Sequence, residues 1–320
     1  MSRAAAAAAA LLLGLATLVP SGPTGAQQPD TADADTVPPA SAERVRSLAD
    51  SLAGTLIAEN RTAGISIAVL RGPDTLLLEG YGEANVELDV PATPKTVYRI
   101  GSVTKQFTAA LVQKLAAAGT LALEDSLARW VEVPDAWQSP ETPVTLRHLL
   151  THTSGIPSYT AVDAFWEASV RHLTHEELLA FVRDDSLAFT PGTDWSYSNT
   201  GYYLLGMVVE EATGRPYDRV LRDSVLAPLG LDRTTYCWQT PILEGRADGY
   251  TRSDSIPGRG KLDSARLVNA RPLSMAPPFS AGALCSTARE LVEWTRSLHG
   301  GALLPADRLE EMTTEAALAD

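Results

Sequence analysis

Ser102-Val103-Thr104-Lys105 places a serine three residues before a lysine, at the start of a stretch that predicts a helix from Thr104 to Ala118. Residues three apart on a helix share one face, so the spacing brings a hydroxyl and an amine together at a helix N-terminus. An activated serine nucleophile needs that combination of a nearby base and the positive end of a helix dipole. On the tetrapeptide alone, the plainer interpretation is a helix-capping serine followed by a solvated lysine.

Two further motifs follow in order along the chain. Tyr197-Ser198-Asn199 lies between the turn Pro191–Asp194 and an apolar run that predicts a helix. A tyrosine and an asparagine on a short loop before a helix can both point into one cleft. Between the two motifs lies His148-Leu149-Leu150-Thr151-His152-Thr153-Ser154-Gly155.

Taken together, the stretches Ser102–Thr108, Leu149–Gly155 and Pro191–Asn199 resemble the serine β-lactamase-related hydrolases. That group contains class C β-lactamases, D,D-peptidases, and carboxylesterases and D-aminopeptidases of the same fold. The resemblance runs from about Ala42 to the end, and its Tyr-x-Asn motif is of the class C kind. It implies an α/β fold of the α+β type: an antiparallel sheet flanked by helices, beside a mostly helical subdomain, with the site between them.

The resemblance also implies roles for four residues. Ser102 would attack a carbonyl carbon and form an acyl-enzyme. Lys105 would help to remove its proton, which requires burial to lower the lysine pKa. Tyr197 would be the partner base or would activate water, and the sequence leaves open which of the two is the working base. Asn199 would bind the substrate amide or hold Lys105. Without the other motifs, Tyr197 would be interpreted as a core tyrosine.

The third motif of these hydrolases is Lys or His, then a small residue and glycine, on a strand that supplies an oxyanion N–H. His299-Gly300-Gly301 is the superficial match, but it follows a predicted helix, Thr287–Leu298, and is therefore interpreted as a helix end. In the family the motif would come after residue 320. We therefore expect the closing C-terminal strands to be absent and the chain to be a fragment.

The function expected from these residues is a secreted serine hydrolase that cleaves an amide, lactam or ester bond. The alternative is a non-catalytic or single-turnover penicillin-binding or sensor protein on the same scaffold. No cofactor and no metal is expected, and the partner is a small-molecule or peptide substrate. The net charge of −13 over 320 residues argues against nucleic acid. Oligomeric state stays open.

The N-terminus predicts export to a secreted or periplasmic location. Residues 1–26 resemble a signal peptide, with Arg3 before an apolar stretch and small residues before a cleavage point after Ala26. Stable membrane insertion is not expected after cleavage, although an uncleaved anchor is the alternative. Residues 27–40 predict a disordered leader. Residues 41–320 form the hydrolase domain, incomplete at its C-terminus, with the helical subdomain at about 121–231.

The cysteines and histidines have plainer interpretations than their chemistry suggests. Cys237 and Cys285 are each expected to be small buried residues, although export would permit a bridge between them. His148 and His152 have the i, i+4 spacing of metal ligands, but no glutamate follows His148, so the zinc-protease motif is absent. A structural role beside the turn at Ser154-Gly155 is preferred.

Periodicity predicts the surrounding elements. A helix is expected from Ala42 to Glu59, with Val45, Leu48, Leu52 and Leu56 on one face. Gly64–Leu70 and Thr75–Gly82 predict an antiparallel hairpin, and Ser253–Gly260 a flexible loop. The remaining expected strands are 97–100 and 234–238, and the remaining helices are 146–150, 175–183, 201–212, 217–226 and 306–312.

Overall fold

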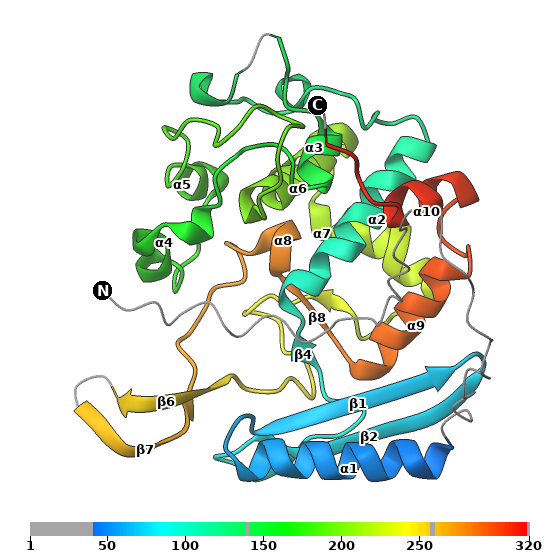
Figure 1. Cartoon of the computed structure of the whole chain (residues 1–320), viewed down its shortest axis with the longest axis vertical. Coiled ribbons are helices and arrows are strands. Elements are labelled where there is room, and N and C mark those ends of the chain that lie inside the picture. Colours follow the sequence, from blue (N-terminus) through cyan, green and yellow to red (C-terminus); the bar gives the residue numbers. More distant parts are fainter. Residues whose placement is uncertain (1–40, 139–140, 257–259, 319–320) are drawn as a thin grey trace, which may run out of the picture.

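The computed structural model describes residues 41–138, 141–256 and 260–318 (Figure 1). The predicted signal peptide and leader, residues 1–40, lie outside the described residues. The structure has the expected mixture of antiparallel sheets and helices. The division of residues 41–320 into a domain with a helical subdomain remains a prediction.

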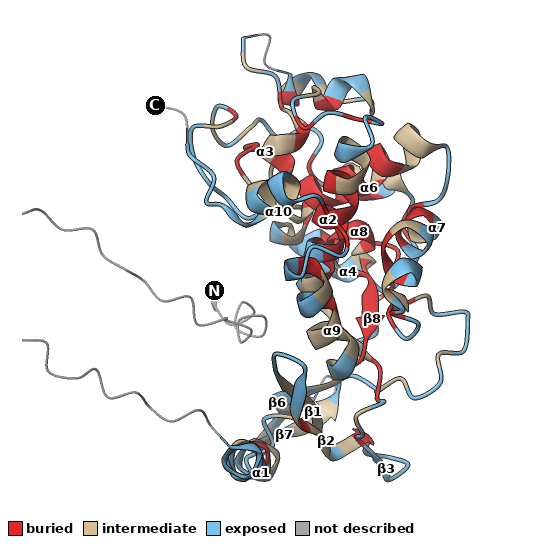
Figure 2. Cartoon of the chain, turned by 90° about the vertical axis from the view of Figure 1, so that its right-hand side faces the viewer, coloured by how far each residue is buried: buried red, intermediate tan, exposed pale blue. Residues whose placement is uncertain are grey.

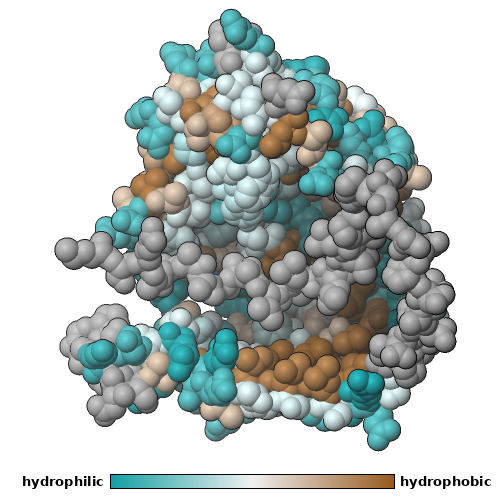
Figure 3. All heavy atoms as spheres, in the orientation of Figure 1, coloured by the Kyte–Doolittle hydropathy of each residue, from teal (hydrophilic) through white to brown (hydrophobic). Residues whose placement is uncertain are grey.

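The first sheet follows the predicted hairpin closely. β1 (Gly64–Arg71) pairs antiparallel with β2 (Asp74–Asn85), which also pairs with the short β3 (Val90–Pro91). The two-residue turn between β1 and β2 contains Gly72, whose φ of +55° suits glycine. Within the described residues β1 has no second strand partner. Its side chains are partly exposed, and an apolar band lies over it in Figure 3.

α1 (Ala42–Ala58) lies along this sheet, as Figure 1 shows, and its N-cap is Ser41, whose side chain accepts a hydrogen bond from the Arg44 N–H. The predicted apolar face is partly wrong: Leu48 and Leu52 are 60% and 54% exposed, whereas Ala49 and Ala53 are buried. The helix therefore lies on the sheet through its small residues, which permit a close approach of the two backbones. A prediction based on the spacing of Val and Leu residues does not identify this alanine face.

A second sheet orders its strands as β4 (Tyr98–Arg99), β8 (Leu284–Ser286) and β5 (Thr235–Tyr236). A disulfide joins Cys237, just after β5, to Cys285 in β8, with the Cα atoms 5.2 Å apart. The sequence leaves the bridge open, and the structure forms it; the expected burial of both cysteines is confirmed. The pairing of β5 with β8 brings the two Cα atoms within bridging distance, and sequence spacing does not reveal that pairing.

The main core lies around α2 (Thr104–Ala117), which α6 (Asn199–Thr213) and α8 (Phe279–Gly282) contact. Figure 2 shows burial concentrated there, away from α1. Phe107 of α2 is fully buried and stacks on Trp294, with ring centroids 4.0 Å apart. The smaller helices are α3 (Leu146–Leu150), α4 (Asp163–Ala168), α5 (His175–Leu179) and α7 (Tyr217–Leu221), which continues as a π-helical turn, Arg222–Leu226.

The C-terminal third contains a β-hairpin that the sequence did not predict. β6 (Tyr250–Ile256) and β7 (Gly260–Asn269) form an antiparallel hairpin where a flexible loop was expected; residues 257–259 of that loop lie outside the described residues. β6 is polar on both faces and none of its described side chains is buried, so it lacks the apolar alternation that identifies a strand.

Two helices follow the hairpin and β8. α9 (Ala288–His299) ends with Gly300 as its cap, so the interpretation of His299-Gly300-Gly301 as a helix end is confirmed. α10 (Ala306–Thr313) completes the described elements. None of the helices in the described part of the chain is long and apolar enough to cross a membrane.

Candidate active site

Ser102 lies in a short 3₁₀ turn, Gly101–Val103, that carries the chain from β4 into α2. Gly101 has φ +51°, a left-handed conformation that glycine adopts without strain. The backbone N–H of Ile100 donates to the carbonyl of Leu284 at 2.9 Å and fixes this corner to β8. Ser102 is exposed, whereas Lys105, one turn later, is only 7% exposed.

Lys105 contacts three oxygen atoms. Its Nζ donates to the Asn199 side-chain oxygen at 2.8 Å, to the Ala281 carbonyl at 2.7 Å and to Ser102 Oγ at 3.3 Å. No carboxylate is among these contacts. Burial lowers the pKa of Lys105 to about 7, from 10.5 for a solvated lysine. A large fraction of this amine is therefore neutral near pH 7.

Tyr197 approaches the serine from the loop before α6. Its hydroxyl donates to Ser102 Oγ at 2.8 Å, and its ring centroid lies 4.9 Å from Lys105 Nζ. Burial raises the Tyr197 pKa above 10, and the hydrogen bond to Ser102 opposes part of that rise. The phenol is therefore protonated at neutral pH. The structure brings Tyr197, Lys105 and Ser102 together, so Tyr197 is not simply a core residue, and its side chain is 41% exposed.

Asn199 is the first residue of α6, whose N-cap is Ser198. Its side-chain NH₂ group donates to Thr160 Oγ1 at 2.9 Å, and its backbone N–H donates to Ser158 Oγ at 3.0 Å. These bonds orient the amide oxygen toward Lys105. Of the two roles predicted for Asn199, the structure shows the contact with the lysine.

His152 supports the loop that carries Tyr197, a role that the sequence did not predict. Its ring centroid lies 4.6 Å from that of Tyr197, its Nδ1 accepts from the Ser198 N–H at 3.2 Å, and its carbonyl accepts from the Ser196 N–H at 3.0 Å. Burial, assisted by Lys105, lowers the His152 pKa to about 4, so the ring is neutral at pH 7. The backbone of His152 has φ +60°, which turns the chain after α3 and brings the ring to Tyr197. The sequence gives no signal of that backbone angle.

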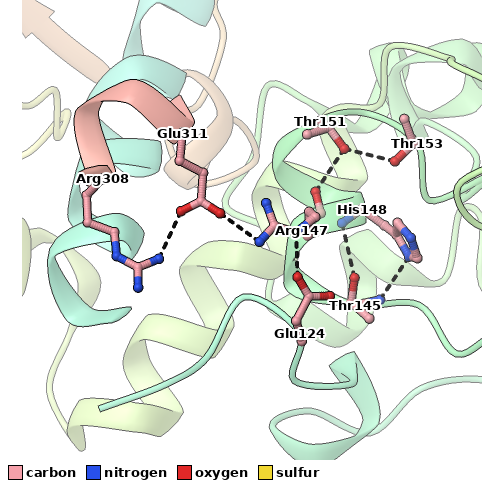
Figure 4. A network of polar contacts seen from close by, with 8 residues as sticks. All are labelled: Glu124, Thr145, Arg147, His148, Thr151, Thr153, Arg308 and Glu311. Atoms are coloured by element: carbon pink, nitrogen blue, oxygen red, sulfur yellow. Dashed lines mark hydrogen bonds and ion pairs between the residues drawn. The ribbon is translucent and has the colours of Figure 1, made fainter. Parts of the chain in front are cut away.

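The metal-ligand spacing of His148 and His152 is not realised on a helix. α3 ends at Leu150, and His148 Nδ1 accepts from the Thr145 N–H at 3.2 Å. Among the described residues, no group of three or more His, Cys, Asp or Glu side chains is placed to hold a metal ion. Figure 4 shows that the neighbouring Arg147 instead forms ion pairs with Glu124 and Glu311, joining α3 to α10.

The sequence also did not predict that the backbone carbonyl of Ala281 accepts a hydrogen bond from Lys105, because a backbone acceptor has no sequence signature. α8, which carries it, is held against α2 and α6: Ser280 Oγ donates to the Tyr202 carbonyl at 2.8 Å, and Thr108 Oγ1 donates to the Ser280 carbonyl at 2.7 Å. A Cβ atom at Gly206 of α6 would lie 2.1 Å from Ser280 Oγ. Glycine at that position thus permits the contact that fixes the Ala281 carbonyl.

Comparison with known proteins decides the family. The family model described as Beta-lactamase matches residues 46–319. The chain belongs to the Beta-lactamase family. Among curated members it is 33% identical to Protein flp of Staphylococcus aureus (strain MW2) over 196 residues, which are 61% of this chain and 39% of that protein. The chain thus spans about two fifths of the length of the curated relatives it matches.

Solved structures of the same fold cover most of this family member. The octameric penicillin-binding protein homologue from Pyrococcus abyssi matches with TM-score 0.71 and 32% identity, over 84% of this chain and 60% of that one. The D-amino acid amidase from Ochrobactrum anthropi SV3 matches with TM-score 0.70 and 29% identity, over 83% of this chain and 74% of that one. The family therefore includes penicillin-binding proteins and D-amino acid amidases, and serine hydrolysis is consistent with both.

Proposed function

We propose that this chain is a serine hydrolase that cleaves an amide, lactam or ester bond through an acyl-enzyme on Ser102. The observation that carries the proposal is the pair of contacts on one oxygen atom: Lys105 Nζ and the Tyr197 hydroxyl both lie within hydrogen-bond distance of Ser102 Oγ. A nucleophile next to an activating group is the general signature of covalent catalysis.

Lys105 is proposed as the base for acylation. A neutral amine has two N–H bonds and one lone pair, and two of its three neighbours, Asn199 Oδ1 and the Ala281 carbonyl, can only accept. In the neutral amine those acceptors occupy the two N–H bonds, so the contact in which Nζ donates to Ser102 reverses, and the lone pair accepts the Oγ–H proton. Oγ then bonds to the substrate carbonyl carbon as its proton passes to Nζ. The pKa of about 7 keeps part of the amine neutral at physiological pH.

Tyr197 is proposed to assist the proton transfers rather than to be the first base. Because its pKa is raised, its phenol donates to Oγ and stabilises negative charge that develops there. Protonated Lys105 then gives its proton to the leaving group as the carbonyl–leaving-group bond breaks, which restores the neutral amine. Water adds to the acyl carbon and passes a proton to Lys105, and that proton returns to Oγ as the Oγ–acyl bond breaks, which frees the acid and restores Ser102.

A single-turnover binding protein is the second candidate. Among the described residues we find no Lys or His followed by a small residue and glycine on a strand beside Ser102, and such a strand would supply an oxyanion donor. Loss of one donor typically costs about 2.7–4 kcal/mol of transition-state stabilisation. Slow deacylation would then leave the protein acylated.

Burst size separates the two functions. Purified protein is mixed with p-nitrophenyl acetate, with the β-lactam nitrocefin and with D-phenylalanine amide, and product is counted per protein molecule. A hydrolase continues beyond one equivalent with at least one of them, whereas a binding protein stops near one. Ser102→Ala is the control for background hydrolysis. Export through residues 1–26 is part of the proposal, and an N-terminal sequence of the protein from the culture fluid or periplasm that begins at Gln27 tests it.

A further inference from the structure

A cavity of about 390 Å³ lies between the start of β1, strand β4 and the base of the β6–β7 hairpin. Its lining residues include four arginines, Arg61, Arg99, Arg246 and Arg271, and two acidic residues, Glu83 and Asp248. We call it the arginine cavity. Such an excess of positive charge is unexpected in a chain whose net charge is −13. None of Ser102, Lys105, Tyr197 and Asn199 lines it, so it is separate from the candidate active site.

Arg246, which lines the arginine cavity, provides the first observation that favours a ligand. Its backbone pairs with Val97 next to β4, and its Nη1 atom is buried with no hydrogen-bond partner. A buried charged donor without an acceptor is costly, and folded proteins rarely leave one. An anion bound at the accessible part of the Arg246 side chain would offset part of that cost by compensating the guanidinium charge.

Arg99 places a second guanidinium close to the first. Its Nη1 donates to the Leu273 carbonyl at 3.4 Å, which leaves other N–H groups available. Burial and then the charge of Arg246 depress the Arg99 pKa, and Asp248 only partly offsets them. Asp248 also accepts a hydrogen bond from the Asn85 side chain. The Asp248 carboxylate therefore interacts with the Asn85 amide as well as with Arg99.

Charge neutralisation inside the protein is incomplete at this cavity. Of the ion pairs found among the described residues, none includes Arg99, Arg246 or Arg271. Arg271 donates to the Glu167 carbonyl at 3.2 Å, and Arg61 at the rim lies 3.9 Å from Glu59. The lining carries four arginines against Glu83 and Asp248, and with the Arg61–Glu59 pair counted one positive charge remains in excess in a concave and partly enclosed space.

We propose that the arginine cavity binds a small oxyanion, through a carboxylate or phosphate group. Planar guanidinium forks match the paired oxygen atoms of these groups and bind them bidentately. The dimensions favour a compact anion, and the acidic surface elsewhere opposes a long polyanion such as nucleic acid. The proposal does not depend on the acyl-transfer function, because no residue of that site takes part.

Isothermal titration calorimetry tests the proposed oxyanion site, with inorganic phosphate and succinate as separate probes. Chloride replaces the probe anion in the blank titrations, so that the ionic strength stays fixed. The unaltered 320-residue chain should bind at least one probe, and the stronger one identifies the oxyanion. Arg246→Gln should weaken that binding at least about tenfold, as loss of a charged hydrogen bond predicts. Arg44→Gln, which makes the same charge change at an exposed position on α1, should stay within about twofold.

Arg61→Gln provides a variant that cannot disturb the core, since its side chain is 62% exposed. It should weaken binding several-fold and keep the circular dichroism spectrum unchanged, even if Arg246→Gln fails to fold. The proposal is overturned if the unaltered chain binds neither probe at 50 mM, a concentration of about a hundred times a sub-millimolar Kd. It is equally overturned if Arg61→Gln and Arg44→Gln weaken binding to the same extent.

Discussion

Asn199→Asp should move the pH dependence of acylation upward, because it places a carboxylate 2.8 Å from Lys105 Nζ where a neutral amide now lies. An opposite charge at that distance raises a lysine pKa by about one to three units. From a starting pKa of about 7, half of the amine is neutral at pH 7. After the change, the neutral fraction at pH 7, and with it the acylation rate, falls about fivefold to about 500-fold. The rate should recover as the pH rises through the new pKa.

The assay is single-turnover acylation by p-nitrophenyl acetate between pH 5 and pH 10, with circular dichroism at each pH. In the parent, the rate should rise through about pH 7, because the neutral amine is the active form. Asn60→Asp is the control: it makes the same chemical change on an exposed turn after α1. A midpoint that stays in place in Asn199→Asp, while the protein remains folded, refutes the assignment of Lys105 as the base.

Three further expectations follow from the same structure. Lys105→Arg should fold and lose about 10²–10⁴-fold in acylation rate, since a guanidinium keeps its proton; a rate within a few-fold of the parent in the same ester assay contradicts this. Replacing Cys237 and Cys285 with alanine should lower the free energy of unfolding by about 2–4 kcal/mol, for a loop of 48 residues; urea titrations that agree with the parent exclude a stabilising bridge. His299→Ala should leave turnover unchanged, because His299 ends α9; lost turnover in a folded variant means that this residue belongs to the site.

The parts of the fold that sequence predicts are those with a strong local signal. The helix after Ser41 and the hairpin at Gly72 each combine apolar periodicity with a cap or a turn residue, and each is found within a few residues of its predicted bounds. The helix predicted over 201–212 is found as α6, Asn199–Thr213. The β6–β7 hairpin was missed because β6 is polar on both faces. The buried face of α1 was misassigned because alanines, not leucines, contact the sheet.

The candidate site shows the same division. Motifs identify the four candidate site residues, Ser102, Lys105, Tyr197 and Asn199, and the structure brings them together. Motifs do not identify the groups that position them. The Ala281 carbonyl reaches Lys105 only through the packing of α8, and His152 reaches Tyr197 only because its backbone leaves α3 at a positive φ. Both depend on tertiary contacts that no local pattern encodes.

The central claim is that Ser102 is the nucleophile, and covalent labelling tests it most directly. The protein is treated with a fluorophosphonate, digested, and mapped by mass spectrometry, with Ser102→Ala treated in parallel. The account predicts one adduct, on the peptide that contains Ser102, and none in the variant. An adduct on Ser154 or Ser198 that persists in Ser102→Ala would place the nucleophile elsewhere and contradict the account.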